Sequence, residues 1–313
     1  MATEKSLSSS DVPELPTWIE REFPFDRRVF TVPSGTFAGR RIHFVDHGPR
    51  DARPVLLMHG NPMWSYLWRR VIPLLGDLRV IAPDLLGLGL SDKLPRLDDH
   101  QLEPHGRAMT ALVDALDLEG LVLVGQDWGG PTVTQIGVNA PGRIAGLVLA
   151  NTAVVVPERP RNTRFHRFAN RPVLSDAAFR LLGFPMQTLH RVQGDPTTLR
   201  GNMAKPYKWP LRRIRDRIAP LALARMVPTH GGHPSMAPMR RAEAWARGFG
   251  GPVSLVWGER DPILGRALKR HIPAFPDAPV RRCQAGHFLQ EEVPGLLAEA
   301  ILETAERAGE ALG

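Results

Sequence analysis

The fold is decided by the stretch Val122-Leu123-Val124-Gly125-Gln126-Asp127-Trp128-Gly129-Gly130-Pro131, an apolar run that ends in Gly-x-Asp-x-Gly. Pro131 fits the first turn of a helix, so the pattern predicts a strand, a sharp turn and a helix. Glycines two residues before and after Asp127 relieve crowding in such a turn. A turn of this kind, a nucleophile elbow, presents its central side chain to a substrate. Here that side chain is a carboxylate instead of a hydroxyl, and an ordinary structural turn is the alternative.

The bulk composition indicates a globular protein. With 313 residues, 43% of them apolar, the chain can bury a large core. No apolar run approaches the roughly 18 residues of a spanning helix, and the polar leader over 1–24 lacks the apolar segment of a secretory signal. Cys283 is the only cysteine, so no intramolecular disulfide can form, and no Cys/His cluster has zinc spacing. We therefore expect a cytoplasmic protein with no metal and no membrane partner.

The net charge of +8 is unevenly distributed. Residues 158–241 hold 17 Lys and Arg against four acidic residues, a net of +13, which leaves about −5 for the remainder. Nucleic acid is one partner for such a segment, but the arginines are irregularly spaced and no nucleic-acid-reading motif accompanies them. We expect no nucleic-acid partner. A solvated surface, a contact in a homo-oligomer, or a field that favours anions near the site are the alternatives.

Apolar strands alternate with helical stretches through most of the chain. We expect strands over 28–32, 40–45, 54–58, 79–82, 122–124, 145–150, 253–257 and 280–283, and helices over 65–75, 105–118, after the elbow, and over 294–312. Continuously apolar strands of this kind predict an α/β fold, a mostly parallel eight-stranded sheet flanked by helices on both faces.

The pattern breaks after Asn151 and returns near 253. The intervening segment is rich in proline and shows only short helical pieces, over 176–182 and 211–218. We therefore predict a core over 25–153, an inserted helical cap over 154–240, and the rest of the core over 241–313.

An elbow nucleophile needs a base and a group that orients the base. Functional side chains gather beyond the carboxyl ends of parallel strands, and two of the predicted strands are followed by Asp261 and His287. The chain order is then nucleophile Asp127, acid Asp261, base His287. Glu259 lies two residues from Asp261, so the identity of the acid is open from spacing alone, and His287 could instead be an ordinary loop histidine.

A carboxylate nucleophile can displace a leaving group from a saturated carbon and form an alkyl ester. His287 would then activate a water that hydrolyses the ester, and the backbone N–H groups of Trp128 and Asn61 could hold the oxyanion. The Trp128 indole and the Asn61 amide could hold a departing halide, since both donate hydrogen bonds. Core packing is the alternative for Trp128, and turn chemistry before Pro62 is the alternative for Asn61.

Other activities are compatible with the same elbow. An epoxide hydrolase would use the same ester but needs phenols to protonate an alkoxide. The chain has only two tyrosines, Tyr66 and Tyr207, and only the second lies in the predicted cap. A non-enzymatic receptor that binds a small apolar ligand is a third alternative, which the intact acid and base disfavour.

Several segments carry a resemblance to a known family. They are His59-Gly-Asn-Pro62, Ser65-Tyr-Leu-Trp68, Asp84-Leu-Leu-Gly-Leu-Gly-Leu-Ser-Asp92, Gly125-Gln-Asp-Trp-Gly-Gly130, Ala150-Asn-Thr152, Trp257-Gly-Glu-Arg-Asp-Pro262 and Ala285-Gly-His-Phe-Leu-Gln-Glu-Glu292. From about residue 25 to the C-terminus, the chain resembles the haloalkane dehalogenases of the α/β-hydrolase fold. The resemblance implies hydrolysis of a small apolar halogenated substrate with release of a halide ion, without a cofactor.

The resemblance also assigns roles. Asp127 resembles the nucleophile, His287 the base, Asp261 the acid, and Asn61 with Trp128 the halide-stabilising pair. One subgroup of the family places a Glu after the sixth strand, where this chain has Asn151-Thr152, so the set resembles the subgroup often called class III. Coelenterazine luciferases share much of this motif set.

The cap is less informative. Phe165, Phe168, Phe184 and Trp209 could line a substrate pocket, or they could form the cap's own core. Phe288, beside the predicted base, is expected to be a pocket wall. The tripeptide Gln193-Gly-Asp195 resembles a turn of the family's cap and not a site.

Overall fold

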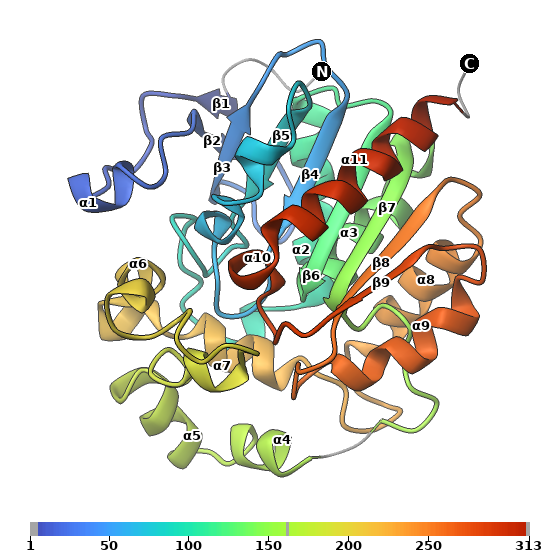
Figure 1. Ribbon diagram of the computed structural model, residues 1–313. Coiled ribbons are helices and arrows are strands. Elements are labelled where there is room, and N and C mark those ends of the chain that lie inside the picture. The colour runs from blue at the N-terminus through green and yellow to red at the C-terminus, as the bar shows by residue number, and fades with distance from the viewer. Residues whose placement is uncertain (1–5, 161–162, 311–313) are drawn as a thin grey trace.

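A nine-stranded sheet forms the centre of the computed structural model, which describes residues 6–160 and 163–310 (Figure 1). The strands lie in the order β1-β2-β3-β5-β4-β6-β7-β8-β9. Their bounds are β1 Leu7–Ser8, β2 Arg27–Thr31, β3 Arg41–His47, β4 Pro54–Met58, β5 Arg79–Pro83, β6 Leu121–Asp127, β7 Ile144–Thr152, β8 Val253–Gly258 and β9 Val280–Cys283. The first three pairings are antiparallel, and every pairing from β5 to β9 is parallel.

Helices cover the sheet and form the cap (Figure 1). They are α1 Thr17–Glu20, α2 Leu102–Ala115, α3 Gly129–Asn139, α4 Arg164–Ala169, α5 Leu174–Asp176, α6 Lys205–Lys208, α7 Ala219–Arg225, α8 Met236–Arg247, α9 Leu268–Ala274, α10 Leu289–Glu292 and α11 Pro294–Glu310. Within the described residues, none of them combines the length and apolarity that crossing a membrane requires.

The predicted α/β architecture is confirmed, because each apolar run of the core forms a strand. Strands β4 and β5 are buried along their whole length, as expected of parallel strands covered on both faces. The sheet has nine strands and not the predicted eight, since Leu7–Ser8 in the leader pairs with β2. The leader therefore contains a short strand, and Thr17–Glu20 adds a helical turn to it.

The helix predicted over 65–75 is wrong. Two short 3₁₀ turns, Ser65–Trp68 and Ile72–Leu74, occupy this segment. Pro73 has no N–H for a helical bond to Arg69, which ends a regular helix here. All four residues of the first turn are buried, so this turn has no exposed helical face, whereas Leu74 of the second turn is exposed.

The cap helices α4 to α7 follow β7 and lie together at the foot of the sheet (Figure 1). The predicted cap boundary at residue 240 falls inside α8. This helix packs against α3 of the core, where a side chain at Gly137 would meet the Trp245 ring. The absence of a side chain at Gly137 thus allows α8 to lie close to the helix that follows the elbow.

The helix predicted over 211–218 is also wrong. The segment contains only the 3₁₀ turn Ile214–Asp216 and the end of another. Arg217 donates hydrogen bonds to the carbonyl oxygens of Leu211, at 2.8 Å, and Arg212, at 3.1 Å. A side chain therefore takes the acceptors that a helix would offer to backbone N–H groups.

A buried polar cluster joins the cap to the core. Glu291 of α10 accepts hydrogen bonds from Arg69 of the core and from the Tyr207 hydroxyl of the cap helix α6. Arg69 also donates to the Tyr207 hydroxyl at 2.9 Å. The Glu291 carboxylate is fully buried, and burial raises the pKa of Tyr207 well above its ordinary value. Removal of one partner would leave a charge without compensation in a dry site.

Replacing Arg69 tests how much this buried cluster contributes to the free energy of unfolding. We expect Arg69→Met to lower the free energy of unfolding by about 3–5 kcal/mol, because Glu291 loses its buried counter-ion. Denaturant unfolding of the two proteins measures the difference. Arg107→Met is the matched control, since its partner Glu103 is exposed and such pairs contribute at most about 1 kcal/mol. Equal destabilisation by the two substitutions would contradict the prediction.

Candidate active site

The elbow is a strained turn at the carboxyl end of β6. Asp127 has a φ of +52°, in the left-handed region that few side chains other than Gly adopt. The Thr152 hydroxyl donates to the Asp127 carbonyl oxygen at 2.6 Å and holds the turn from the neighbouring strand. A side chain at Gly129 would meet the Met58 carbonyl oxygen, so the glycine lets α3 begin against β4. Asp127 is thereby fixed at the edge of the sheet.

The loop after β4 supplies hydrogen bonds to the Asp127 carboxylate. The backbone N–H of Asn61 donates to Asp127 Oδ1 at 2.8 Å, and the backbone N–H of Trp128 also binds the carboxylate. A side chain at Gly60 would collide with this carboxylate, so the close approach requires glycine. Two backbone donors thus converge on one side of the nucleophile.

His59 fixes the loop that carries Asn61. Its Nε2 accepts a hydrogen bond from the Leu85 N–H at 3.1 Å, so the proton is on Nδ1, which donates to the Gly60 carbonyl oxygen at 2.9 Å. Burial lowers the pKa of His59, which favours this neutral form. His59 therefore links the loop after β4 to the loop after β5, at the carboxyl ends of these two strands.

The predicted base and acid lie against the nucleophile. His287 Nδ1 is 2.9 Å from Asp261 Oδ2, and His287 Nε2 is 3.6 Å from Asp127 Oδ2. The second Asp261 oxygen accepts from the Ile263 N–H at 2.7 Å. Glu259, the other acid left open by the sequence, is exposed and accepts from the Gln284 amide. The structure therefore brings Asp261 to His287 and leaves Glu259 outside.

Burial and charge act in opposite directions on these groups. Burial raises the pKa of Asp127, while His287 and the two backbone N–H groups oppose the rise. For His287, burial alone would lower the pKa, but Asp261 and then Asp127 raise it above its ordinary value. A base with a raised pKa is a stronger proton acceptor once it is neutral.

The two residues of the predicted halide pair adjoin the nucleophile: Trp128 follows Asp127 in the chain, and the Asn61 backbone N–H donates to the Asp127 carboxylate. Trp128 is buried and immediately precedes α3. The Asn61 side-chain amide donates to the Pro220 carbonyl oxygen of the cap helix α7 at 3.0 Å. An amide nitrogen carries two hydrogens, so one donor of Asn61 stays available.

Two residues near the base were not predicted as part of the site. Asn151, with a φ of +35°, donates to the carbonyl oxygens of Gly286 and His287 at 2.8 and 3.2 Å and accepts from the Gly258 N–H at 2.9 Å. Gln126 donates to the His287 carbonyl oxygen at 3.1 Å. In the sequence, only their position at the ends of two neighbouring strands could have indicated that they belong to the site. Asn151 links the loop of the base to the strand that precedes the acid.

The cap also holds the base. The His287 N–H donates to the Val192 carbonyl oxygen at 2.8 Å, and the Phe288 N–H donates to Gln193 Oε1 at 2.9 Å. Glu292 accepts from the N–H groups of Gly194 and Gly286, at 3.1 and 2.7 Å, and so joins the two loops. The turn that begins at Gln193 is therefore a support of the catalytic loop.

The aromatic residues predicted as pocket walls lie in different places. Phe168 and Phe184 pack with Phe179 in a small core of the cap, with ring centroids 6.3 Å apart or closer. Phe165 is largely exposed, and Trp209 lies in a groove on the outer face of the cap. Phe288 is buried, with its ring centroid 4.6 Å from that of His287.

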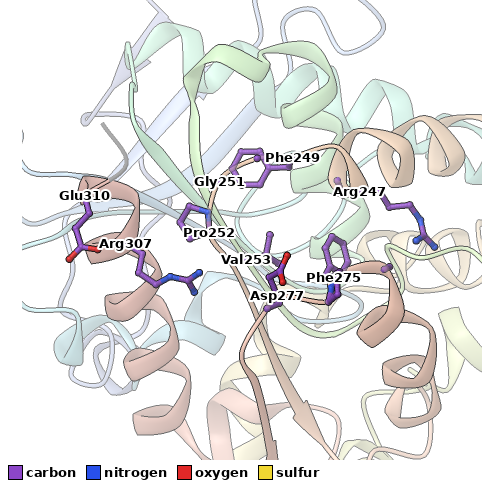
Figure 2. Close-up of a pocket in the computed structure, with 14 residues that line it drawn as sticks. Arg247, Phe249, Gly251, Pro252, Val253, Phe275, Asp277, Arg307 and Glu310 are labelled. Carbon is purple, nitrogen blue, oxygen red and sulfur yellow. The ribbon is translucent and has the colours of Figure 1, made fainter. Parts of the chain in front are cut away.

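A groove of about 610 Å³ lies elsewhere, where β8 begins (Figure 2). Phe249, Phe275, Asp277 and Arg307 are among its walls. It lies at the amino end of β8, opposite the end from which Asp261 extends, so it is not the candidate active site. Within residues 6–160 and 163–310, no cluster of three or more His, Cys, Asp and Glu side chains could hold a metal ion.

Comparison with known proteins agrees with this geometry. Residues 53–294 match the family model of the alpha/beta hydrolase fold. The chain is 34% identical to a haloalkane dehalogenase of Mycolicibacterium paratuberculosis, over 90% of this chain and 93% of the relative. It is 37% identical to haloalkane dehalogenase 1 of Mycobacterium tuberculosis, over 90% and 93% of the two chains.

Solved structures give the same result. The haloalkane dehalogenase DatA of Agrobacterium tumefaciens superposes with a TM-score of 0.78 at 27% identity, over 90% of this chain and 97% of that one. A tetrameric haloalkane dehalogenase of Paraglaciecola agarilytica gives 0.75 at 26% identity, over 93% and 96%. With its fold, its elbow and these relatives, the chain belongs to the haloalkane dehalogenases, enzymes of the α/β-hydrolase fold.

Proposed function

We propose that the chain hydrolyses halogenated alkanes to an alcohol, a halide ion and a proton through an alkyl ester on Asp127. One observation carries the proposal. Asp127 Oδ1 accepts the Asn61 N–H at 2.8 Å while Oδ2 faces His287 Nε2 at 3.6 Å, a separation longer than a hydrogen bond. One oxygen is thus held by donors, and the other is free to attack.

In the first step, Asp127 Oδ2 would attack the carbon that bears the halogen. A carbon–oxygen bond forms, the carbon–halogen bond breaks, and the halide leaves with the electron pair. No proton moves, so His287 has no role here. Desolvation supports this step, because a buried carboxylate is destabilised relative to one in water and loses its charge on alkylation.

In the second step, His287 Nε2 would take a proton from a water whose oxygen attacks Cγ of the Asp127 ester. The developing negative charge falls on Oδ1, to which the Asn61 N–H already donates, and the Trp128 N–H also binds this carboxylate. Asp261 keeps the imidazole in the required orientation and stabilises the imidazolium. The tetrahedral intermediate then expels the alkoxide, which takes the proton from the His287 imidazolium and leaves as the alcohol. The Asp127 carboxylic acid loses its remaining proton, which is the proton released overall, and the carboxylate returns.

We propose that the Trp128 indole and the second Asn61 amide hydrogen hold the halide. Trp128 follows the nucleophile in the chain, the Asn61 backbone N–H binds it, and both side chains can donate hydrogen bonds. The acid follows β8, and Asn151 occupies the other acid position of the family, so we assign the chain to the Asp-His-Asp subgroup.

The tyrosines give no support to an epoxide hydrolase. The Tyr66 hydroxyl donates to Glu22, and the Tyr207 hydroxyl donates to Glu291. Neither phenol is therefore directed at an alkoxide formed beside Asp127.

Removal of the nucleophile gives the first test. We expect Asp127→Ala to release no halide above background from 1-bromobutane or 1,2-dibromoethane, because no ester can form. Halide release over a panel of brominated and iodinated alkanes is the measurement, and Asp277→Ala, at an exposed aspartate far from the elbow, is the matched control. Halide release by Asp127→Ala at the control's rate would overturn the proposal.

A base variant separates the two steps. His287→Phe is expected to form the ester without hydrolysing it, because alkylation needs no base. Mass spectrometry of peptides after incubation with substrate should find one alkyl group on Asp127. The double variant Asp127→Ala/His287→Phe provides the blank. An unmodified Asp127 in His287→Phe, with an active wild type, would show that the roles are wrongly assigned.

The pH profile tests the charge on the base. Hydrolysis needs neutral His287, so kcat should fall as pH drops through the pKa of His287, which lies above its ordinary value of 6.5. In Asp261→Asn, the carboxylate that raises this pKa is lost and burial still lowers it. The acidic limb should therefore move to lower pH, besides a loss of rate. An unmoved limb would show that another group titrates.

A further inference from the structure

The outer face of the cap beside α1 exposes several large apolar side chains. The exposed fractions are 72% for Leu182, 60% for Leu181, 51% for Ile214 and 44% for Trp18. Single exposed apolar residues are ordinary, but a contiguous group marks a contact surface.

These residues form one surface. Trp18 of α1 and Trp209, Gly183 and Arg217 of the cap line a single groove of about 370 Å³. Arg217 donates to the carbonyl oxygens of Leu181, at 3.1 Å, and Leu211, which holds the two cap segments together. Figure 1 shows α1 beside α6 at the same edge of the molecule. We call this surface, Trp18, Leu181, Leu182, Trp209 and Ile214 with its groove, the cationic cap face.

Basic side chains surround the apolar ones. Lys205, Lys208 and Arg212 line the groove, and Arg213 and Arg215 lie on either side of Ile214 and are exposed.

The acidic groups nearby are few and engaged. Asp216 is 4.0 Å from Arg215, Glu20 pairs with Arg27, and Glu22 accepts from Tyr66. The cationic cap face therefore has an excess of positive charge.

We propose that the cationic cap face docks on the surface of an anionic lipid bilayer. Leu181, Leu182 and Ile214 would enter the boundary between headgroups and acyl chains, with Trp18 at headgroup depth, where its indole is favoured. The lysines and arginines would contact the lipid phosphates, each contributing to binding at short range. An anionic bilayer favours binding by a protein face that has an apolar centre and a basic rim.

Two other binding partners for the cationic cap face, a second copy of the chain and nucleic acid, fit its charge and apolar side chains less well. A second copy docked through the same face would oppose its own basic rim, so a homo-oligomer, one of the alternatives that the sequence left open, would use another face. Nucleic acid would satisfy the cations but leave the leucines without an apolar partner. The expectation of no membrane partner rested on the lack of a spanning segment, and attachment to a surface needs none. This inference does not depend on the proposed reaction.

Vesicle flotation with the full chain tests the proposal. At about 0.1 M salt, the protein should float with vesicles of phosphatidylglycerol and phosphatidylcholine and bind phosphatidylcholine vesicles far more weakly. Leu181→Ser/Leu182→Ser should reduce partitioning at least about tenfold. Arg213→Gln/Arg215→Gln should reduce it about 30-fold.

Two matched double variants carry the same chemical changes elsewhere. Leu74→Ser/Leu302→Ser and Arg266→Gln/Lys269→Gln alter exposed residues outside the face and should bind as the wild type does. Equal binding to both kinds of vesicle, or wild-type binding by Leu181→Ser/Leu182→Ser, would overturn the proposal. So would a dimer in light scattering that these serines disperse, or retention on duplex DNA that replaces vesicle binding. Halide release in solution should be the same in all four variants.

Discussion

Everything in the site depends on keeping a carboxylate charged in a place with little water. Burial raises the pKa of Asp127 and so favours its protonated form, which is a poor nucleophile. Two backbone N–H groups and a nearby histidine offset this cost without closing the attacking oxygen. The left-handed turn at Asp127 is what brings the carboxylate to these donors, so the backbone strain serves the chemistry.

The cap is connected to the catalytic groups at several points. Tyr207 reaches Glu291 beneath α10, the Pro220 carbonyl oxygen accepts from Asn61, and the Val192 carbonyl oxygen accepts from the His287 N–H. Each contact ends on a residue of the site or on the element beside it. The cap therefore takes part in orienting the predicted base.

Much of the core could be predicted because its signals are local. Continuous apolar runs predicted the inner strands, and the polar residues after them gave Asp127, Asp261 and His287. Spacing could not choose between Asp261 and Glu259, since one residue of loop register decides which carboxylate faces the imidazole. The tertiary contact settled what the sequence left open.

The cap could not be predicted in the same way. Its helices are short, and their bounds depend on side-chain hydrogen bonds to the backbone, as where Arg217 binds the carbonyl oxygens that a helix over 211–218 would use. Asn151 shows the same limit within the core. The sequence showed that it was not an acid, but its three hydrogen bonds, two to the loop of His287 and one from Gly258 of β8, became visible only in the folded chain.

Val192 and Gln193 contact the catalytic loop, so substitutions in this part of the cap and substitutions in the rest of the cap have different consequences for catalysis. Substitutions around Phe165 and Phe184 alter only packing within the cap, so mutation can change them gradually. A change at 192–193 would disturb the base whatever the substrate. Divergence among related enzymes should therefore concentrate in the first part of the cap, while residues 192–193 keep their support of the catalytic loop.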